Sequence, residues 1–147
     1  NKGVINNYAF ANCSAIKTLL IDTCVGNIGQ YAFQKCSALE TVTIKNNGMI
    51  GLKAFESSSK GNPATYVISN VGLIGESAFA NCSKLQKVRL GNQVGNINQR
   101  AFYNCVLLDS LTLPNTVNTL GDSVFYNCNN LAYAQLSNTL STIGNAF

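Results

Sequence analysis

The sequence predicts an α/β solenoid of about six repeats, with short parallel strands on one face and short helices or turns on the other. Three observations support this prediction. All seven phenylalanines recur at intervals of 22 to 24 residues, an apolar triplet follows most of them, and a column of cysteines keeps the same interval. A unit of this size is too small to bury its own apolar side chains, so successive units must stack.

The phenylalanines define the repeat. An apolar residue stands five positions before each of the first six, and Ala or Val stands directly before every one. We therefore expect each ring to be buried at the same place in its unit. The positions are Phe10, Phe33, Phe55, Phe79, Phe102, Phe125 and Phe147.

The apolar triplet predicts one short strand per unit. In the fourth unit, Leu85, Val88 and Leu90 end in the period-2 alternation that is typical of a strand with one buried face. Strands of stacked units are expected to pair in parallel, about 4.8 Å apart. The third unit is irregular, and its strand is predicted at 65–68.

The segment around each phenylalanine predicts a short helix. In the fifth unit, Ile97, Ala101, Phe102 and Cys105 stand at offsets of 0, 4, 5 and 8 residues. Such spacing is typical of one or two helical turns with an inward apolar stripe.

The segment Leu111–Cys128, with the sequence LTLPNTVNTLGDSVFYNC, resembles the BspA-type leucine-rich repeat of surface proteins from bacteria and anaerobic protists. The resemblance covers essentially the whole chain and includes the pairs Ile28-Gly29, Ile74-Gly75 and Ile143-Gly144. It implies that residues 1–147 form a single leucine-rich-repeat solenoid. Because the sequence shows no polar capping unit at either end, we expect this solenoid to be an interior fragment of a longer array. The resemblance also implies a location at the cell surface or outside the cell, and an adhesive role.

The residue types present argue against catalysis, cofactors and metals. The chain has no histidine, which removes the commonest general base and the commonest metal ligand. Its six carboxylates are scattered along the chain, none forms a pair by local spacing, and no C-x-x-C pair exists. We therefore expect no enzyme activity, no cofactor and no metal site. Five of the six cysteines share one column and are expected to be free, buried thiols, while Cys24 lies off the column.

Charge and hydropathy argue against two classes of partner. The formal net charge is only +4, and no run of Lys or Arg is present, so we expect no nucleic-acid binding. No stretch of about 18 apolar residues occurs, so we expect no membrane insertion of this segment.

The outward positions of the strands are the candidate binding surface. Lys87, Arg89 and Tyr133 are the expected anchors, because Arg and Tyr are favoured at protein interfaces. The same strip carries hydroxyl and amide side chains that could contact a ligand. The ligand is expected to be a protein or a glycan. The further strip residues are Thr18, Thr41, Thr43, Thr112 and Gln135.

Other interpretations remain open at this point. The chain could instead be a structural spacer or a self-assembling matrix or filament element, joined through its repeat ends, and an intracellular scaffold is a third alternative. The polar segment 57–63 predicts a protruding loop, either a ligand contact or a tolerated insertion. The sequons at Asn12 and Asn81 are either glycan acceptors or by-products of the repeat.

Overall fold

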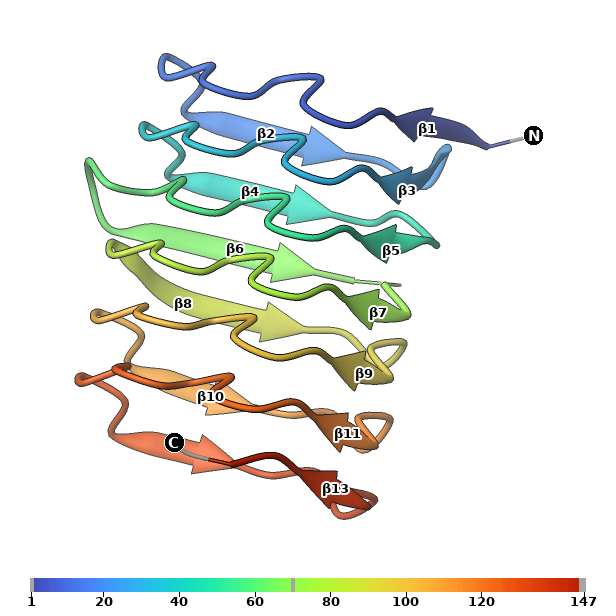
Figure 1. Cartoon of the computed structure of the whole chain (residues 1–147), viewed down its shortest axis with the longest axis vertical. Helices are drawn as coiled ribbons and strands as arrows, with labels where there is room; N and C mark the ends of the chain where they lie inside the picture. Colours follow the sequence, from blue (N-terminus) through green and yellow to red (C-terminus); the bar gives the residue numbers. More distant parts are fainter. Residues whose placement is uncertain (1, 70, 146–147) are drawn as a thin grey trace.

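In the computed structural model, which describes residues 2–69 and 71–145, the chain winds into a parallel β-solenoid of about six coils (Figure 1). Each coil places one strand in each of two sheets, here called sheet A and sheet B. The coils are numbered 1 to 6 and comprise residues 3–24, 25–48, 49–72, 73–95, 96–118 and 119–141.

Sheet A has seven strands of two to four residues, and sheet B has six strands of three to six residues. Sheet A consists of β1 (Gly3–Ile5), β3 (Val25–Ile28), β5 (Met49–Ile50), β7 (Leu73–Ile74), β9 (Asn96–Ile97), β11 (Thr119–Leu120) and β13 (Thr142–Ile143). Sheet B consists of β2 (Thr18–Ile21), β4 (Thr41–Ile44), β6 (Ala64–Ile68), β8 (Leu85–Leu90), β10 (Ser110–Thr112) and β12 (Tyr133–Gln135).

Parallel pairing between successive coils is confirmed throughout both sheets. The strand predicted at 65–68 corresponds to β6. In sheet B, residues at equivalent positions of successive coils lie side by side. On the outward side Thr41 pairs with Thr65, and on the inward side Val42 pairs with Tyr66.

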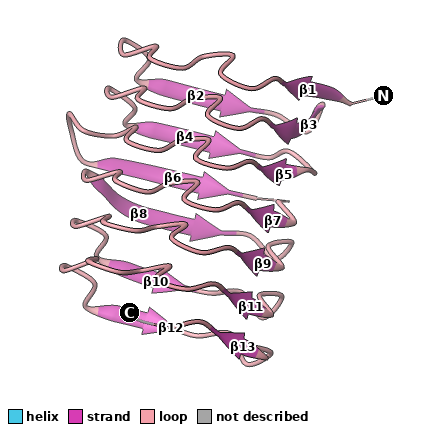
Figure 2. Cartoon of the chain, in the orientation of Figure 1, coloured by secondary structure: helices cyan, strands magenta, loops and turns pink. Residues whose placement is uncertain are grey.

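The predicted short helices are wrong. Nowhere in the described part of the chain is there a helix, and strands and loops alone build each coil (Figure 2). In coil 5, the segment expected to be helical contains Arg100 and Asn104 with φ of 56° and 61°, in the left-handed region that interrupts an α-helix. The fold is therefore all-β, with strands on two faces in place of strands and helices.

Backbone hydrogen bonds explain why a helix-like spacing arises without a helix. The Phe102 N–H donates to the carbonyl of Val124 in the next coil, at 3.0 Å. Its neighbours Ala101 and Tyr103 instead close tight turns onto Asn98 and Arg100, at 3.2 and 3.0 Å. Successive N–H groups thus alternate between the next coil and a local turn, which places side chains inward at nearly helical offsets.

The stacked phenylalanines form the centre of the core. Neighbouring ring centroids lie 4.9 to 5.6 Å apart, with interplanar angles of 17° or less. Phe10 is 43% exposed, whereas the next five rings are buried, which confirms the predicted core for those five. Phe147 lies outside the described residues. Burial of each such ring contributes about 1.5–3 kcal/mol.

Glycines allow the coils to approach closely beside sheet A. A Cβ added at Gly75 would lie 2.4 Å from the carbonyl oxygen of Ile50 and within 3.0 Å of Gly51. Real Cβ atoms do not approach backbone so closely, so glycine is required there by contact between coils. The Ile-Gly pairs of the sequence mark this column.

Coil 3 contains a buried hydroxyl cluster. The Tyr66 hydroxyl lies 2.7 Å from Ser58 Oγ and 2.5 Å from Ser59 Oγ, and all three residues are fully buried. The segment 57–63, predicted as a protruding loop, is therefore buried at Ser58 and Ser59, and only its exposed part, residues 60–63, protrudes beside β6 (Figure 1). The N–H groups of Lys60 and Gly61 donate to the Ser37 carbonyl, at 2.9 and 3.2 Å, which ties the loop to coil 2.

Candidate functional site

The outward face of sheet B brings the candidate residues into two rows. The pleat of each strand sends alternate side chains inward, where Val42, Val88 and Leu111 are buried, and leaves the others facing out. The parallel register aligns the outward residues from coil to coil. The first row is Thr18, Thr41, Thr65, Lys87, Ser110 and Tyr133, and the second comprises Leu20, Thr43, Val67, Arg89, Thr112 and Gln135. We call these twelve residues the outward strip.

Lys87 and Arg89 are the charged centre of the outward strip. Both are exposed on β8, two residues apart and therefore on the same face. None of the twelve strip residues is acidic, and no described carboxylate lies within ion-pair distance of either side chain. The strip therefore presents uncompensated positive charge.

A shallow depression of about 360 Å³ adjoins Arg89. Ser110 and Thr112 of the next coil line it, together with Asn92 and Pro114. The depression thus combines a guanidinium group with hydroxyl groups, and it is open enough for an extended chain to lie across it.

The remaining candidates lie along the strip at increasing distance from this centre. Tyr133 is 56% exposed in coil 6, and its hydroxyl donates to Gln135 Oε1 at 3.2 Å. Thr18 and Thr41 are exposed and Thr43 is half-buried, in coils 1 and 2. From coil 1 to coil 6 the strip is roughly 24 Å long at the usual spacing of strands. It suits an extended or flat partner better than a small enclosed ligand.

The cysteine column is a packing feature with a hydrogen-bond role. All six cysteines are free, as predicted, and four of the five column thiols are buried. Cys82 Sγ donates to the carbonyl of Phe55 in the preceding coil at 3.1 Å, and Cys105 repeats this bond to Phe79 at 3.2 Å. Burial raises the pKa of the Cys82 thiol to about 11, so this thiol stays protonated and unreactive at neutral pH.

No cluster of three or more potential metal ligands occurs among the residues that the structure describes. Within the same residues, no helix has the length and apolar character needed to cross a membrane.

Sequence comparison decides the family. A model of the BspA-type leucine-rich repeat region matches six copies, over residues 3–62 and 49–147. The chain belongs to the BspA-type leucine-rich-repeat family. Members of this family are generally non-enzymatic repeat scaffolds that act in protein interactions, which agrees in broad terms with the predicted class. No curated protein matches the sequence.

Solved structures of bacterial leucine-rich-repeat proteins share the fold. A leucine-rich repeat protein from Bacteroides ovatus is 27% identical, with a TM-score of 0.88 over 97% of this chain and 36% of its own. A leucine-rich cell surface protein from Faecalibacterium prausnitzii is 23% identical, with a TM-score of 0.62 over 90% of this chain and 42% of its own. The chain thus spans less than half the length of either.

A third similar structure is the pneumococcal vaccine antigen PcpA, which is 24% identical with a TM-score of 0.63. The match covers 85% of this BspA-type chain and 33% of PcpA. Of these structural neighbours, the F. prausnitzii protein is thus described as a cell surface protein and PcpA as a vaccine antigen.

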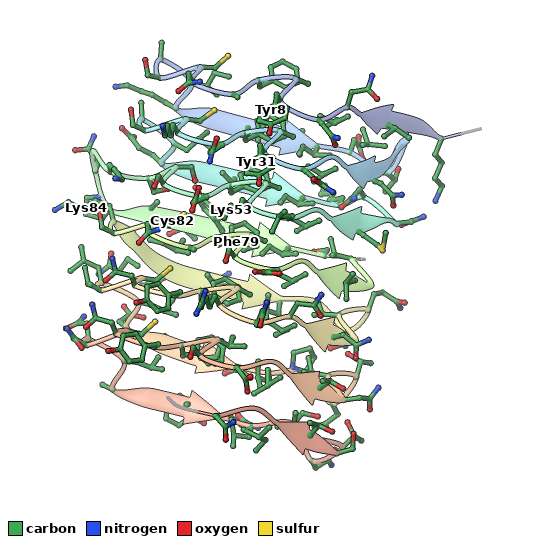
Figure 3. All side chains as sticks on the ribbon, viewed as in Figure 1. Tyr8, Tyr31, Lys53, Phe79, Cys82 and Lys84 are labelled. Carbon is green, nitrogen blue, oxygen red and sulfur yellow. The ribbon has the colours of Figure 1, made fainter. Side chains whose placement is uncertain are left out.

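Sequence reasoning missed a second polar surface, on the turn side of the solenoid. There Tyr103 stacks on Tyr126, with ring centroids 5.1 Å apart, and Asn104 donates from Nδ2 to Asn81 Oδ1 at 3.0 Å. At the other end Tyr8 stacks on Tyr31 at 4.8 Å (Figure 3). The recurrence of tyrosine and asparagine at the repeat interval was the available signal.

Proposed function

We propose that the chain is a recognition module of a cell-surface or secreted protein, and that it binds an acidic segment of a partner protein through the outward strip. The family supports an interaction role, and the surface protein from F. prausnitzii and the antigen PcpA support the location. An adhesive function follows if the partner belongs to a host or to another microbe.

The observation that carries this proposal is the uncompensated pair Lys87 and Arg89 in the middle of a flat, hydroxyl-rich face. The Arg89 guanidinium offers the bidentate geometry that carboxylates prefer. Ser110 and Thr112 can donate to or accept from the backbone or side chains of the same segment. An extended peptide with carboxylates therefore satisfies the strip better than a neutral or basic one.

Binding to an immobilised peptide of about ten glutamates tests the proposal. The double variant Lys87→Ala/Arg89→Ala is expected to bind at least about tenfold more weakly, and wild-type binding should weaken as salt is raised. The control Lys35→Ala/Lys60→Ala removes the same charge from exposed residues outside the strip.

Equal loss of binding in both double variants would show attraction by net charge alone and would remove the role of the strip. Preferential binding of glycans by the strip, lost in Lys87→Ala/Arg89→Ala, would replace the protein partner by a glycan.

A spacer or self-assembling element is the second candidate, favoured by the uniform row Thr18, Thr41 and Thr65 in coils 1 to 3. A regular row of threonines needs no specific ligand and allows lateral packing of identical faces. Sedimentation at increasing concentration tests it: assembly that is abolished by Thr41→Lys would support the spacer. A strictly monomeric full-length protein would exclude it.

A further inference from the structure

A groove with a glycine floor runs along the outer side of sheet A, and its lining residues do not overlap with the outward strip. It consists of a hollow of about 490 Å³ mainly beside coils 1 to 4 and one of about 400 Å³ beside coils 4 to 6. Glu76 and Asn98 line both hollows, so the two are continuous along the strands of sheet A, which follow one another down the solenoid in Figure 1. We call this depression the sheet A groove. Its floor glycines are Gly29, Gly51, Gly75, Gly121 and Gly144.

Close packing of the coils keeps side chains off the floor. A Cβ added at Gly51 would lie 2.8 Å from the carbonyl oxygen of Ile28, and one added at Gly29 would lie 2.6 Å from the carbonyl carbon of Asn6. Side chains therefore line the groove mainly from two walls, one position before and two positions after the buried residue of each short strand. Coil 5 differs, because Asn98 stands at the floor position where the two hollows meet.

The walls beside coils 1 to 4 are largely apolar. Val4 and Met49 are 58% and 47% exposed, and Leu52 and Leu73 are half-buried. Apolar side chains that gather around one open hollow gain free energy when a partner covers them, and the thioether of Met49 adapts to different shapes. This half of the groove therefore favours aliphatic side chains of a partner.

The walls beside coils 4 to 6 are acidic. Glu76 and Asp122 occupy equivalent wall positions two coils apart, roughly 10 Å at the usual strand spacing. The described ion pairs join other residues, so neither carboxylate has a cation within ion-pair distance in the described part of the chain. Asp122 Oδ1 accepts from the Asn145 N–H at 2.7 Å, which orients this side chain. The lining of both hollows contains no Lys or Arg, so the charge of the groove is negative.

From this combination we infer that the sheet A groove binds an extended segment of a partner protein in which aliphatic and basic residues follow one another. The aliphatic side chains pack against Met49 and Leu73, and two Lys or Arg side chains reach Glu76 and Asp122. An extended chain rises about 3.3 Å per residue, so cations three residues apart match the two carboxylates. The half-buried Asn98 lies between the two halves, where its amide can pair with the backbone of the segment.

Charge distinguishes this segment from other occupants of the groove. A neutral apolar segment would cover the half-buried Glu76 without supplying a cation, and an acidic segment would be repelled. The chain as a whole carries a formal net charge of +4, so net charge opposes the approach of a basic segment. Binding of such a segment would therefore report the local chemistry of the groove.

Binding of labelled peptides to the full chain, measured by fluorescence anisotropy, tests the inference. The probe is the acetylated and amidated peptide Leu-Ser-Leu-Ser-Lys-Ser-Ser-Lys, used together with its reversed sequence because the groove is open to either chain direction. Two comparison peptides replace both leucines by serine or both lysines by glutamate. The probe is expected to bind, in at least one direction, about tenfold or more tightly than either comparison peptide.

Two double variants remove the two halves of the site separately. Val4→Ser/Met49→Ser removes exposed apolar side chains, and Glu76→Gln/Asp122→Asn removes both charges while an amide oxygen at position 122 can still accept from Asn145. Each double variant is expected to weaken binding of the probe by about fivefold or more. Only Glu76→Gln/Asp122→Asn should also abolish the weakening of binding by added salt.

Matched controls make the same changes outside the groove. Leu20→Ser/Leu136→Ser removes two exposed apolar side chains, and Glu40→Gln/Asp109→Asn removes two carboxylates. Both controls should bind the probe like the wild type.

Binding of the probe should also survive in Lys87→Ala/Arg89→Ala, because the groove is separate from the outward strip. A failure of the strip to bind acidic peptides and a failure of the groove to bind the probe are therefore distinguishable.

The inference is overturned if the probe does not bind in either direction, or if the leucine-free or glutamate peptide binds as tightly. It is also overturned if the folded variants Val4→Ser/Met49→Ser and Glu76→Gln/Asp122→Asn bind like the wild type, or if the controls lose binding equally. Self-association of the chain that is lost in Val4→Ser/Met49→Ser, without binding of the probe, would overturn it too and would assign the groove to a second copy of this chain.

Discussion

Coils 3 and 4 fill the same two core positions with different side chains. Coil 4 has Cys82 and Val88 at these positions, whereas coil 3 has Ser58 and Tyr66. The Tyr66 ring packs edge-on against Phe55 and Phe79, with centroids 6.2 and 5.7 Å away, while these two phenylalanines stack directly on each other at 5.2 Å.

A substitution at the position of Ser58 or of Tyr66 is therefore expected to require a matching substitution at the other. A buried phenol needs hydrogen-bond partners, and Ser58 and Ser59 supply them. A single exchange toward the residue of the other coil would leave polar groups unpaired or a cavity unfilled. The irregular third repeat is therefore a coordinated substitution within the same fold.

The largest effect is expected for Tyr66→Val, which gives coil 3 the residue that coils 2 and 4 carry there. The variant removes most of a buried ring, leaves the Ser59 hydroxyl without its partner and leaves Ser58 only the Cys82 sulfur, so the free energy of unfolding should fall by about 3–5 kcal/mol. Urea denaturation measures it. The outward neighbour Val67→Thr is the control and should change stability by less than about 0.5 kcal/mol.

If Tyr66→Val lowered the free energy of unfolding by less than about 1 kcal/mol, the described packing of coil 3 would be contradicted.

The contact between coils 3 and 4 beside sheet A should tolerate no side chain. Gly75→Ala places a Cβ against the backbone of Ile50 and Gly51 and is expected to destabilise by about 2–3 kcal/mol. Gly72→Ala is the matched control, because no atom lies within 4 Å of its added Cβ. Thermal unfolding should separate the two variants, and equal melting temperatures would refute the close approach of the coils.

A smaller loss is expected for Tyr66→Phe, which keeps the ring and removes only the hydroxyl. Ser59 then loses its partner and Ser58 keeps only the Cys82 sulfur at 3.4 Å, which should lower the free energy of unfolding by about 1–2 kcal/mol. Adding Ser58→Ala and Ser59→Ala should recover part of this loss, because the unpaired hydroxyls are then gone. A further additive loss in the triple variant would contradict the coupling between these residues.

The smallest effect is a difference in alkaline stability. Burial raises the pKa of Cys82 from 9.0 to about 11, so between these values the native state keeps a proton that the unfolded chain loses. Stability is therefore unaffected below pH 9 and falls as pH rises toward 11. At pH 10 the contribution of this thiol is about 1 kcal/mol.

Cys82→Ser gives coil 4 the non-ionising side chain of coil 3. Its free energy of unfolding should decline less between pH 8.5 and about 10.5 than that of the wild type, as urea denaturation at both pH values would show. If the free energy of unfolding declined equally with pH in Cys82→Ser and in the wild type, the pKa of the Cys82 thiol would not be raised in the folded chain.

Much of this fold could be predicted from sequence, because the Phe column and the strand triplets depend on local period. The rows of the outward strip follow from alternation alone, and the register of Thr41, Thr65 and Lys87 confirms their alignment. Whether those residues bind a ligand stays a prediction.

The rest depends on contacts between coils that one repeat does not reveal. The helices were wrong because alternating turns and inter-coil hydrogen bonds around Phe102 produce inward offsets close to those of a helix. Sheet A was missed because strands such as Asn96–Ile97 are too short to show alternation.

In this fold the segment around each phenylalanine bonds to the next coil and is not helical. NMR scalar coupling across the hydrogen bond of the Phe79 N–H group measures this. The structure predicts a coupling to the carbonyl carbon of Ala101, since the Phe79 nitrogen lies 2.8 Å from that oxygen. A coupling to the carbonyl carbon of Gly75, four residues earlier, would indicate an α-helix and would contradict the parallel β-solenoid.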